Sequence, residues 1–294
     1  MNYKPILTRY GYYYTEPEPT KEEINKFYEE EFYLKPKTYI NDSSLEVRDK
    51  DSDFYNFWYD FYINIINDNN ENIDLINESL IDLGCGYGHF LKYVKDSTSI
   101  KKLKGVEPFP EFLEYVEAQK IEGEISTLED FVSNSHESYN IVTMINVLEH
   151  LRNPKKVLTE INNNILNDDG LLLIQVPNDF NIIQKIAVKK NKCHDWWFTP
   201  PQHLSYFSPS SLENLLKACG FSEMISYCSF PIDMFLLMGT DYIKDPKLGR
   251  DAHLKRLSFE KSFLEFDGVD ELKKIYHSFA KAEIGREIIC IARK

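Results

Sequence analysis

The stretch that decides the fold is IDLGCGYGHF, at residues 81–90. An apolar run ends in Asp82, and Gly84, Gly86 and Gly88 follow before a helical pattern begins. Glycines let the backbone turn tightly and approach a ligand closely, while the N-terminus of the following helix offers unpaired amides. The stretch therefore predicts a strand, a ligand-binding loop and a helix, and an adenosine-containing cofactor is the occupant we expect.

Short apolar runs that alternate with helical patterns extend this unit along the chain. The runs lie at residues 80–84, 102–107, 141–146, 171–177 and 286–293. Between them, Asn153 with Pro154 and Ser208 with Pro209 are typical of helix starts, and Gly220 is typical of a helix end. Alternation of this kind predicts an α/β fold with a mostly parallel sheet and helices on both faces.

The segments that flank these runs fit the alternation poorly. We therefore expect four regions: an N-terminal extension or cap at 1–75, a cofactor-binding core at 76–230, an insertion at 231–283 that binds the acceptor or forms a dimer contact, and a final core strand at 284–294. Within the extension, the charged stretch at 20–33 predicts a helix.

Composition restricts the partners of the chain. A net charge of −13 over 294 residues argues against a nucleic-acid substrate, because such binders need a basic surface that neutralises phosphates. The five cysteines have neither CxxC spacing nor the density of a disulfide scaffold, so we expect reduced thiols and a cytoplasmic protein. No run of about 18 apolar residues is present to span a bilayer. The expected partner is a small-molecule acceptor, with a homodimer as a further option.

The glycine spacing decides between two kinds of adenosine cofactor. A dinucleotide fingerprint needs GxGxxG, but the sixth position counted from Gly84 is His89, which weakens a dehydrogenase interpretation. The next predicted strand ends in Glu107, whose carboxylate can accept hydrogen bonds from both hydroxyls of a ribose. Together the two motifs indicate a single nucleoside at the carboxyl ends of neighbouring strands.

Four blocks, at residues 81–91, 105–116, 139–178 and 203–221, carry a resemblance to a known family. In order and spacing they resemble the class I S-adenosylmethionine-dependent methyltransferases, and in particular the small-molecule and sugar O-methyltransferases of bacteria. The resemblance implies a Rossmann-like sheet of seven strands with the last strand antiparallel. It also implies S-adenosylmethionine as the cofactor and S-adenosylhomocysteine as the product.

The resemblance further implies roles for single residues. Asp82, Gly84 and Gly86 would surround the methionine portion of the cofactor, and Glu107 would hold its ribose. Leu128 would flank the adenine, and Asn146 with Val147 would line the sulfonium side. The complete implied set is Asp82, Gly84, Cys85, Gly86, Gly88, Glu107, Pro108, Leu128, Asn146 and Val147. The family usually begins its fourth strand with Asp, where this chain has Asn140; we expect that position to be structural.

Two histidines are the candidate catalytic residues. If the acceptor is an alcohol, a general base must remove its proton, and His150 and His203 both follow predicted strands near the ligand-binding edge. The alternative for each histidine is a helix cap or a backbone hydrogen bond. Glu149 is expected to have a structural rather than a chemical role.

The segment 185–203 offers further hypotheses. Its four lysines, with Trp196, Trp197 and Phe198, would form a lid that meets phosphates and a sugar ring of the acceptor, or else a solvated helix face followed by a tryptophan anchor. Cys193, His194 and His203 suggest zinc, but no second pair has metal-ligand spacing, so we expect no metal. The aromatic cluster at 10–14 is expected to cover the sheet, with lining of the acceptor pocket as the alternative.

Several functions remain in competition at this point. The first is O-methylation of a sugar, a nucleotide-sugar or a surface-polysaccharide precursor. The second keeps the cofactor and makes the acceptor a phenolic quinone precursor or an amine, which would favour an apolar pocket. The third is a non-catalytic cofactor-binding partner protein.

Overall fold

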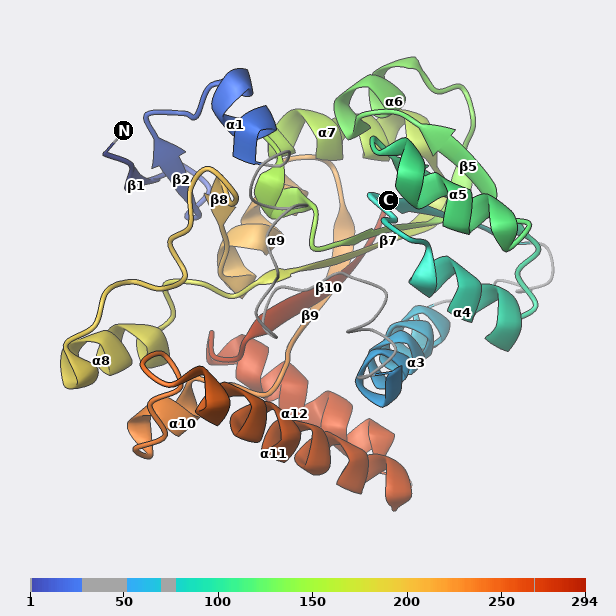
Figure 1. Ribbon diagram of the computed structural model, residues 1–294. Coiled ribbons are helices and arrows are strands. Elements are labelled where there is room, and N and C mark those ends of the chain that lie inside the picture. Colours follow the sequence, from blue (N-terminus) through green and yellow to red (C-terminus); the bar gives the residue numbers. More distant parts are fainter. Residues whose placement is uncertain (1, 28–51, 70–77, 267) are drawn as a thin grey trace.

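The computed structural model describes residues 2–27, 52–69, 78–266 and 268–294. Within these residues, seven strands form a central sheet in the order β5-β4-β3-β6-β7-β10-β9 (Figure 1). The strands are β3 (Ser79–Leu83), β4 (Lys102–Glu107), β5 (Glu122–Ile125), β6 (Tyr139–Ile145), β7 (Leu166–Pro177), β9 (Ser222–Cys228) and β10 (Glu287–Arg293).

The sheet is mixed in the way that the sequence predicted. Strands β5, β4, β3, β6 and β7 pair in parallel, whereas β10 runs antiparallel to both of its neighbours, β7 and β9. The prediction of a Rossmann-like α/β fold with seven strands and an antiparallel last strand is confirmed. Each predicted apolar run forms a strand, and the run at 171–177 belongs to a longer strand that begins at Leu166.

Helices cover both faces of the sheet, and each face has its own apolar core. One core involves α6 (Leu128–Asn134), α7 (Pro154–Glu160) and α9 (Pro209–Lys217), together with a π-helical turn at Ile161–Ile165. The other involves α3 (Ser52–Asp68), α4 (His89–Ser97), α5 (Pro110–Ala118) and α12 (Val269–Lys281). Figure 1 shows α3, α4 and α12 on one side of the sheet and α7 on the other.

The two cores follow from the alternation of side chains along each strand. Leu172, Ile174 and Val176 of β7 contact the first core, whereas Leu171 and Leu173 contact the second. Successive side chains of a strand point to opposite faces, so a strand covered on both sides must be apolar throughout. This requirement explains why the deciding runs read as continuous apolar stretches rather than as alternating ones.

The predicted helix starts are present. Asn153 accepts a hydrogen bond from the Lys156 amide at the start of α7, and Ser208 accepts one from the Ser211 amide at the start of α9. Asn140 also has the structural role that we expected, because its side-chain oxygen accepts hydrogen bonds from the Ser79 amide and hydroxyl and so joins β6 to β3.

A small second sheet lies beside the main one. Strands β1 (Lys4–Leu7), β2 (Tyr13–Glu16) and β8 (Ser205–Tyr206) form it among the described residues, with β2 in the middle. Tyr13 and Tyr14 of the aromatic cluster belong to β2, whereas Tyr10 and Tyr12 precede it, and Tyr12 packs into the first core. Helix α1 (Lys21–Phe27) accounts for the first part of the predicted helix at 20–33, and the remainder of that prediction lies outside the described residues.

The flanking segments contribute directly to the core. Helix α3, from the N-terminal segment, and helix α12, from the segment 231–283, both pack in the second core against the sheet. A third apolar cluster joins α8 (Ile182–Asn191), α10 (Met234–Leu237) and α11 (Pro246–Glu265). The segments predicted as additions are thus continuous with the sheet layers, and the predicted region boundaries remain predictions.

Two expectations about environment can be compared with the described residues. Among the described helices, none is both long enough and apolar enough to cross a membrane. All five cysteines lie in the described part of the chain, and none of them forms a disulfide.

The strength of the core can be tested at Leu173. This side chain is fully buried in the central strand β7, so replacement by alanine leaves a cavity between the sheet and α3 or α12. We expect Leu173→Ala to lower the free energy of unfolding by about 2–5 kcal/mol in urea denaturation. The matched control is Leu254→Ala on α11, where the side chain is 45% exposed and the change should be within about 0.5 kcal/mol.

Candidate functional site

The predicted cofactor residues meet at one edge of the main sheet. Strand β3 lies between β4 and β6, and the parallel register pairs Asp82 with Gly105 on one side and with Thr143 on the other. The carboxyl ends of all three strands therefore lie together, and the loops that follow them are neighbours. In open α/β sheets, ligands bind at this edge.

The glycine loop after β3 has the conformation that its sequence predicts. Gly84, Gly86 and Gly88 have φ angles of 78°, 51° and 68°. Residues with a Cβ adopt such positive φ angles only with steric strain. The amides of Gly84 and Cys85 donate to the Val106 carbonyl, so the loop is held against β4. The loop thus turns sharply away from the sheet and leads into α4.

Gly84 is needed for a second reason. A Cβ at this position would lie 2.5 Å from Cγ2 of Val147, which is the residue expected on the sulfonium side of the cofactor. At Gly86, by contrast, a Cβ would have no neighbour within 4 Å. The first glycine allows the loops after β3 and β6 to touch, whereas the second lies against open space.

Glu107 ends β4 and points toward the glycine loop. Its carboxylate accepts a hydrogen bond of 3.0 Å from the Gly86 amide. The pKa of Glu107 is raised to about 7, mainly by burial and to a smaller extent by the Asp82 and Glu111 carboxylates, against the opposing effect of the Gly86 and Phe109 amides. The Glu107 carboxylate has about four lone-pair sites, and the two backbone amides use only part of them. It can therefore accept further hydrogen bonds from a ligand.

Asp82 and Asn146 complete the part of the edge nearest to β6. Asp82 is buried and accepts a hydrogen bond of 2.7 Å from the Thr143 hydroxyl. Asn146 has a φ of 57°, and its amide donates to the Gln175 carbonyl, while the Gln175 side chain donates to the Asn146 side chain. The Tyr62 hydroxyl of α3 donates to the same Gln175 side chain. A flanking helix is therefore connected to the loop after β6.

The remaining predicted cofactor residues occupy the same edge. Leu128 is the first residue of α6, directly after β5, and is buried. Pro108 follows Glu107 and is partly exposed. The partly buried thiol of Cys85 has its pKa raised well above the usual range, by desolvation first and then by the Asp82 and Glu107 carboxylates, so it is neutral. The structure thus brings all ten predicted cofactor residues to adjoining strand ends.

The two candidate histidines also come together, although 53 positions separate them in the sequence. His150 ends a one-turn 3₁₀ helix, Leu148–His150, that directly follows Val147. The His203 ring lies with its centroid 4.9 Å from that of His150, edge to face. The Leu204 amide donates to the Glu149 carbonyl, and this hydrogen bond of 2.8 Å fixes the segment that carries His203 against the 3₁₀ helix.

Glu149 belongs to the same cluster. Its side chain is 2% exposed, and its Oε1 lies 3.6 Å from Nε2 of His150. Burial raises the pKa of Glu149 well above its usual range and lowers the pKa of His150, and burial together with the positive charges of His150 and Arg286 lowers that of His203. The histidines and the carboxyl thus share one buried environment at the end of β6.

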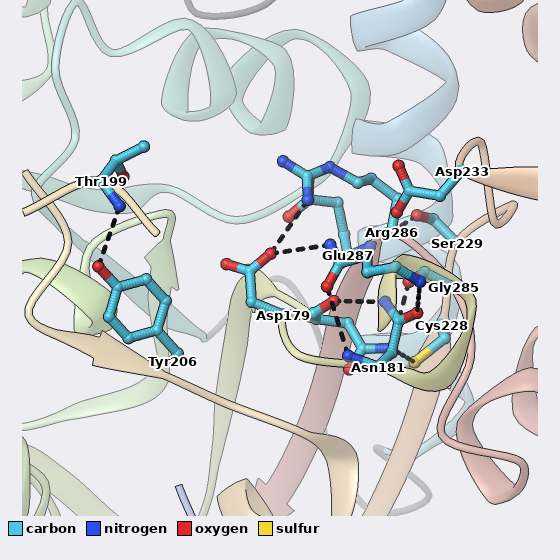
Figure 2. A network of polar contacts seen from close by, with 12 residues as sticks. Asp179, Asn181, Thr199, Tyr206, Cys228, Ser229, Asp233, Gly285, Arg286 and Glu287 are labelled. Atoms are coloured by element: carbon cyan, nitrogen blue, oxygen red, sulfur yellow. Dashed lines mark hydrogen bonds and ion pairs between the residues drawn. The ribbon is translucent and has the colours of Figure 1, made fainter. Parts of the chain in front are cut away.

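Sequence reasoning missed a group of charged residues next to this cluster. Figure 2 shows Asp179 turned toward Arg286, and the two side chains form an ion pair of 3.1 Å. Asp179 follows the carboxyl end of β7, while Arg286 immediately precedes β10. Burial alone would lower the pKa of Arg286, but the Asp179 and Glu287 carboxylates raise it above its ordinary value. The signal in the sequence was Asp179 itself, which is a carboxylate at a strand end.

The charged group has a defined scaffold. Asn178 pairs with Phe207 in an isolated bridge, and its side chain donates to the carbonyls of Glu283 and Gly285. Asp233, which is buried, accepts a hydrogen bond from the Tyr242 hydroxyl. Asn178 therefore joins the segment after β7 to the segment that carries Arg286, and the Tyr242 hydroxyl holds Asp233.

The residues proposed for a lid are distributed over α8 and the loop that follows it. The four lysines, Lys185, Lys189, Lys190 and Lys192, are exposed, and Lys190 donates to the Leu237 carbonyl. Trp197 is buried and contacts Phe180 edge to face, whereas Trp196 is partly exposed. Among the described residues, Cys193 and His194 do not join His203 in a group with metal-ligand geometry; Glu149 and His150 do.

The two glycines provide a test of the loop. In Gly86→Ala only the left-handed backbone is strained, so we expect a loss of about 1–2 kcal/mol in the free energy of unfolding. In Gly84→Ala the methyl group must also displace Val147, which adds about 1–3 kcal/mol. Thermal and urea unfolding of both variants measures the difference. Equal stabilities would show that the loops after β3 and β6 do not touch as described.

Comparison with known proteins agrees with this geometry. A family model described as a methyltransferase domain matches residues 46–225, which is 180 of the 294 residues. No curated protein matches the chain significantly.

Three similar solved structures illustrate the range of relatives. A SAM-dependent methyltransferase from Archaeoglobus fulgidus is 16% identical and has a TM-score of 0.46, with 74% of this chain and 86% of that chain covered. A possible histamine N-methyltransferase from Thermotoga maritima is 17% identical, with a TM-score of 0.47 and coverages of 84% and 96%. Phosphoethanolamine N-methyltransferase 2 from Haemonchus contortus, in complex with S-adenosyl-L-methionine, is 14% identical, with a TM-score of 0.45 and coverages of 76% and 50%.

The family match, the seven-stranded sheet and the glycine loop agree with one another. The chain belongs to the methyltransferase domain family and is a class I S-adenosylmethionine-dependent methyltransferase.

Proposed function

We propose that this methyltransferase transfers the methyl group of S-adenosylmethionine to a hydroxyl of a sugar-containing small molecule, such as a nucleotide-sugar or a surface-polysaccharide precursor. The observation that carries the proposal is a group of charged residues, the buried Asp179 with the half-buried Arg286 and Glu287, beside His150 and His203. An acceptor that meets such a surface has polar groups of its own.

The cofactor occupies the edge formed by β3, β4 and β6 in this proposal. Gly84 and Gly86 allow its methionine portion to approach the backbone, and the Glu107 carboxylate accepts hydrogen bonds from the ribose hydroxyls. Leu128 lies on the β5 side, where an adenine is flanked by an apolar side chain. Asn146 and Val147 lie on the β6 side, next to the sulfonium and its methyl group.

The reaction needs alignment more than it needs a covalent intermediate. The acceptor oxygen gives its proton to a nearby base, for which His150 and His203 are the candidates, and attacks the methyl carbon; the new O–C bond forms as the C–S bond breaks, and the electron pair of that bond remains on sulfur. An enzyme accelerates such a displacement mainly by holding the two reactants in line. His150 follows Val147 in the loop after β6, and the His203 ring contacts it, which supports a role for both histidines next to the acceptor oxygen.

The polarity of the surroundings favours a polar acceptor over a quinone precursor. Asp179 and Asp233 are buried, and Arg286 is half buried between strand ends. Burying charges is costly, and they are kept where they are paired or meet a polar ligand. A phenolic quinone precursor would instead be matched by apolar side chains.

The flanking segments are proposed to complete the acceptor site. The segment that carries His203 is hydrogen-bonded to β2 through the Thr15 amide and the Leu204 carbonyl, so the N-terminal cap lies against the histidine cluster. Asp233 and Tyr242 from the segment 231–283 lie on the opposite side of Arg286. The exposed lysines of α8 would then meet the phosphates of the acceptor, and the buried Trp197 anchors the loop behind them. A cytoplasmic location agrees with the five free cysteines.

Calorimetry tests the cofactor proposal. We expect wild-type protein to bind S-adenosylmethionine and S-adenosylhomocysteine but not NAD, and Glu107→Ala to bind both sulfur compounds at least about tenfold more weakly, because a charged hydrogen-bond partner is lost. Glu114→Gln, an exposed carboxylate on α5, is the matched control and should bind as the wild type does. Binding of NAD instead would refute the assignment of the glycine loop.

The same titration has an expected dependence on pH. Because the pKa of Glu107 is raised to about 7, its carboxylate is ionised above pH 7 and becomes protonated below it. Only the ionised form accepts hydrogen bonds from both ribose hydroxyls, so affinity for S-adenosylhomocysteine should fall as pH decreases below about 7, by at most about tenfold per pH unit. Glu107→Gln should not show this decrease.

An acceptor panel separates the competing functions. We expect transfer of radiolabelled methyl groups to nucleotide-sugars, and little transfer to catechols or primary amines of similar size. Methylation of a catechol or an amine in preference to every sugar compound would contradict the proposed acceptor class. Binding of S-adenosylhomocysteine without conversion of any acceptor would favour the non-catalytic partner protein.

A further inference from the structure

The cluster of Glu149, His150 and His203 has features that a general base does not explain. Each side chain offers one ligand atom, and these three atoms lie within 4.8 Å of one another. Two imidazoles and one carboxylate form a common ligand set for divalent transition metals with open coordination positions. No other group of this kind was found among the residues that the structure describes.

Two atoms of the cluster are buried without a hydrogen-bond partner. They are Oε2 of Glu149 and Nδ1 of His203, and within the described chain neither has a donor or an acceptor in reach. Leaving a buried polar atom without a partner is costly, and in a native site a water, an ion or another ligand often satisfies it. The Glu149 side chain is 2% exposed, so bulk water does not satisfy it.

The His150 ring is oriented in the manner of a metal ligand. Its Nδ1 lies 2.7 Å from the Gln202 carbonyl oxygen. A carbonyl only accepts, so Nδ1 carries the proton, and the Nε2 lone pair is directed toward the cluster, 3.6 Å from Glu149. A histidine that ligates a metal usually donates its other N–H to a carbonyl or a carboxylate in this way.

We propose that Glu149, His150 and His203 bind one divalent transition-metal ion. The expectation of no metal rested on ligand spacing in the sequence, and the fold supplies the third ligand from a segment 53 positions away. The site is distinct from the Cys193, His194 and His203 set that spacing first suggested. Ligand atoms about 2.1 Å from the ion would require only small side-chain movements from the observed separations.

The role of the ion toward the acceptor rests on the proposed function, whereas its binding does not. Two or three open positions on the ion would take neighbouring hydroxyl oxygens of a sugar. The ion lowers the pKa of a bound hydroxyl, so that its proton leaves to solvent and the oxygen attacks the methyl carbon as the C–S bond breaks. In this arrangement the histidines are metal ligands, and the ion rather than a histidine base activates the hydroxyl.

Cobalt(II) provides a direct probe of the site. Tag-free, chelator-treated protein would be titrated with cobalt(II) chloride while visible d–d absorption is recorded, and the metal content would be counted after gel filtration. We expect one cobalt per chain in the wild type. Glu149→Gln and His203→Asn should each weaken binding by at least about tenfold, because each removes one ligand.

The matched control is His194→Asn, which removes an exposed histidine next to Cys193 and should bind cobalt as the wild type does. The wild-type titration needs no variant, so a variant that fails to fold leaves the proposal testable. Circular dichroism and S-adenosylhomocysteine calorimetry on the same preparations would show that the variants are folded.

The outcomes separate the site from the proposed function. Absence of cobalt binding in the wild type, or loss of cobalt in His194→Asn with retention in the other two variants, would overturn the metal site. Cobalt binding without S-adenosylhomocysteine binding would leave the site supported and refute the proposed function. Binding of S-adenosylhomocysteine by wild-type protein that binds no cobalt would overturn the metal site and leave the proposed function standing.

Discussion

The structure depends above all on the position of β3 between β4 and β6. Parallel hydrogen bonding on both sides places the carboxyl ends of these strands side by side, and with them Asp82, Glu107 and Asn146. The glycine loop then has a fixed space to turn into, because the loop after β6 closes against Gly84 at a distance that excludes a Cβ.

Much of this arrangement was predictable, because it depends on patterns of residues that are close together in the sequence. The alternation of apolar runs and helix starts predicted the sheet, and the glycine spacing with Glu107 predicted the edge of the sheet that we propose for the cofactor. Asn153 and Ser208 cap helices where the sequence indicated, since capping depends on residues only three positions apart. Interactions between residues so close in the sequence can be predicted from a single sequence.

The acceptor side was not predictable in the same way. Glu149, His150 and His203 meet because the Leu204 amide donates a hydrogen bond to the Glu149 carbonyl. The spacing of these residues in the sequence does not predict that contact. Arg286 pairs with Asp179 across 107 positions, because β10 returns antiparallel beside β7. Likewise, α3 and α12 looked like additions but cover the sheet, since a long-range core contact has no local signature. The segments that are hardest to interpret in the sequence are those that line the proposed acceptor site.

The chain from Tyr62 through Gln175 to Asn146 has a consequence for engineering. A helix of the N-terminal segment is joined through one buried glutamine to the loop proposed to hold the cofactor's sulfur. The cap is therefore not an interchangeable module. A chimera that exchanges the N-terminal segment for that of a relative would have to carry a matching hydroxyl for Gln175. Without that hydroxyl, the exchange would change the acceptor specificity and at the same time disturb the loop that carries Asn146.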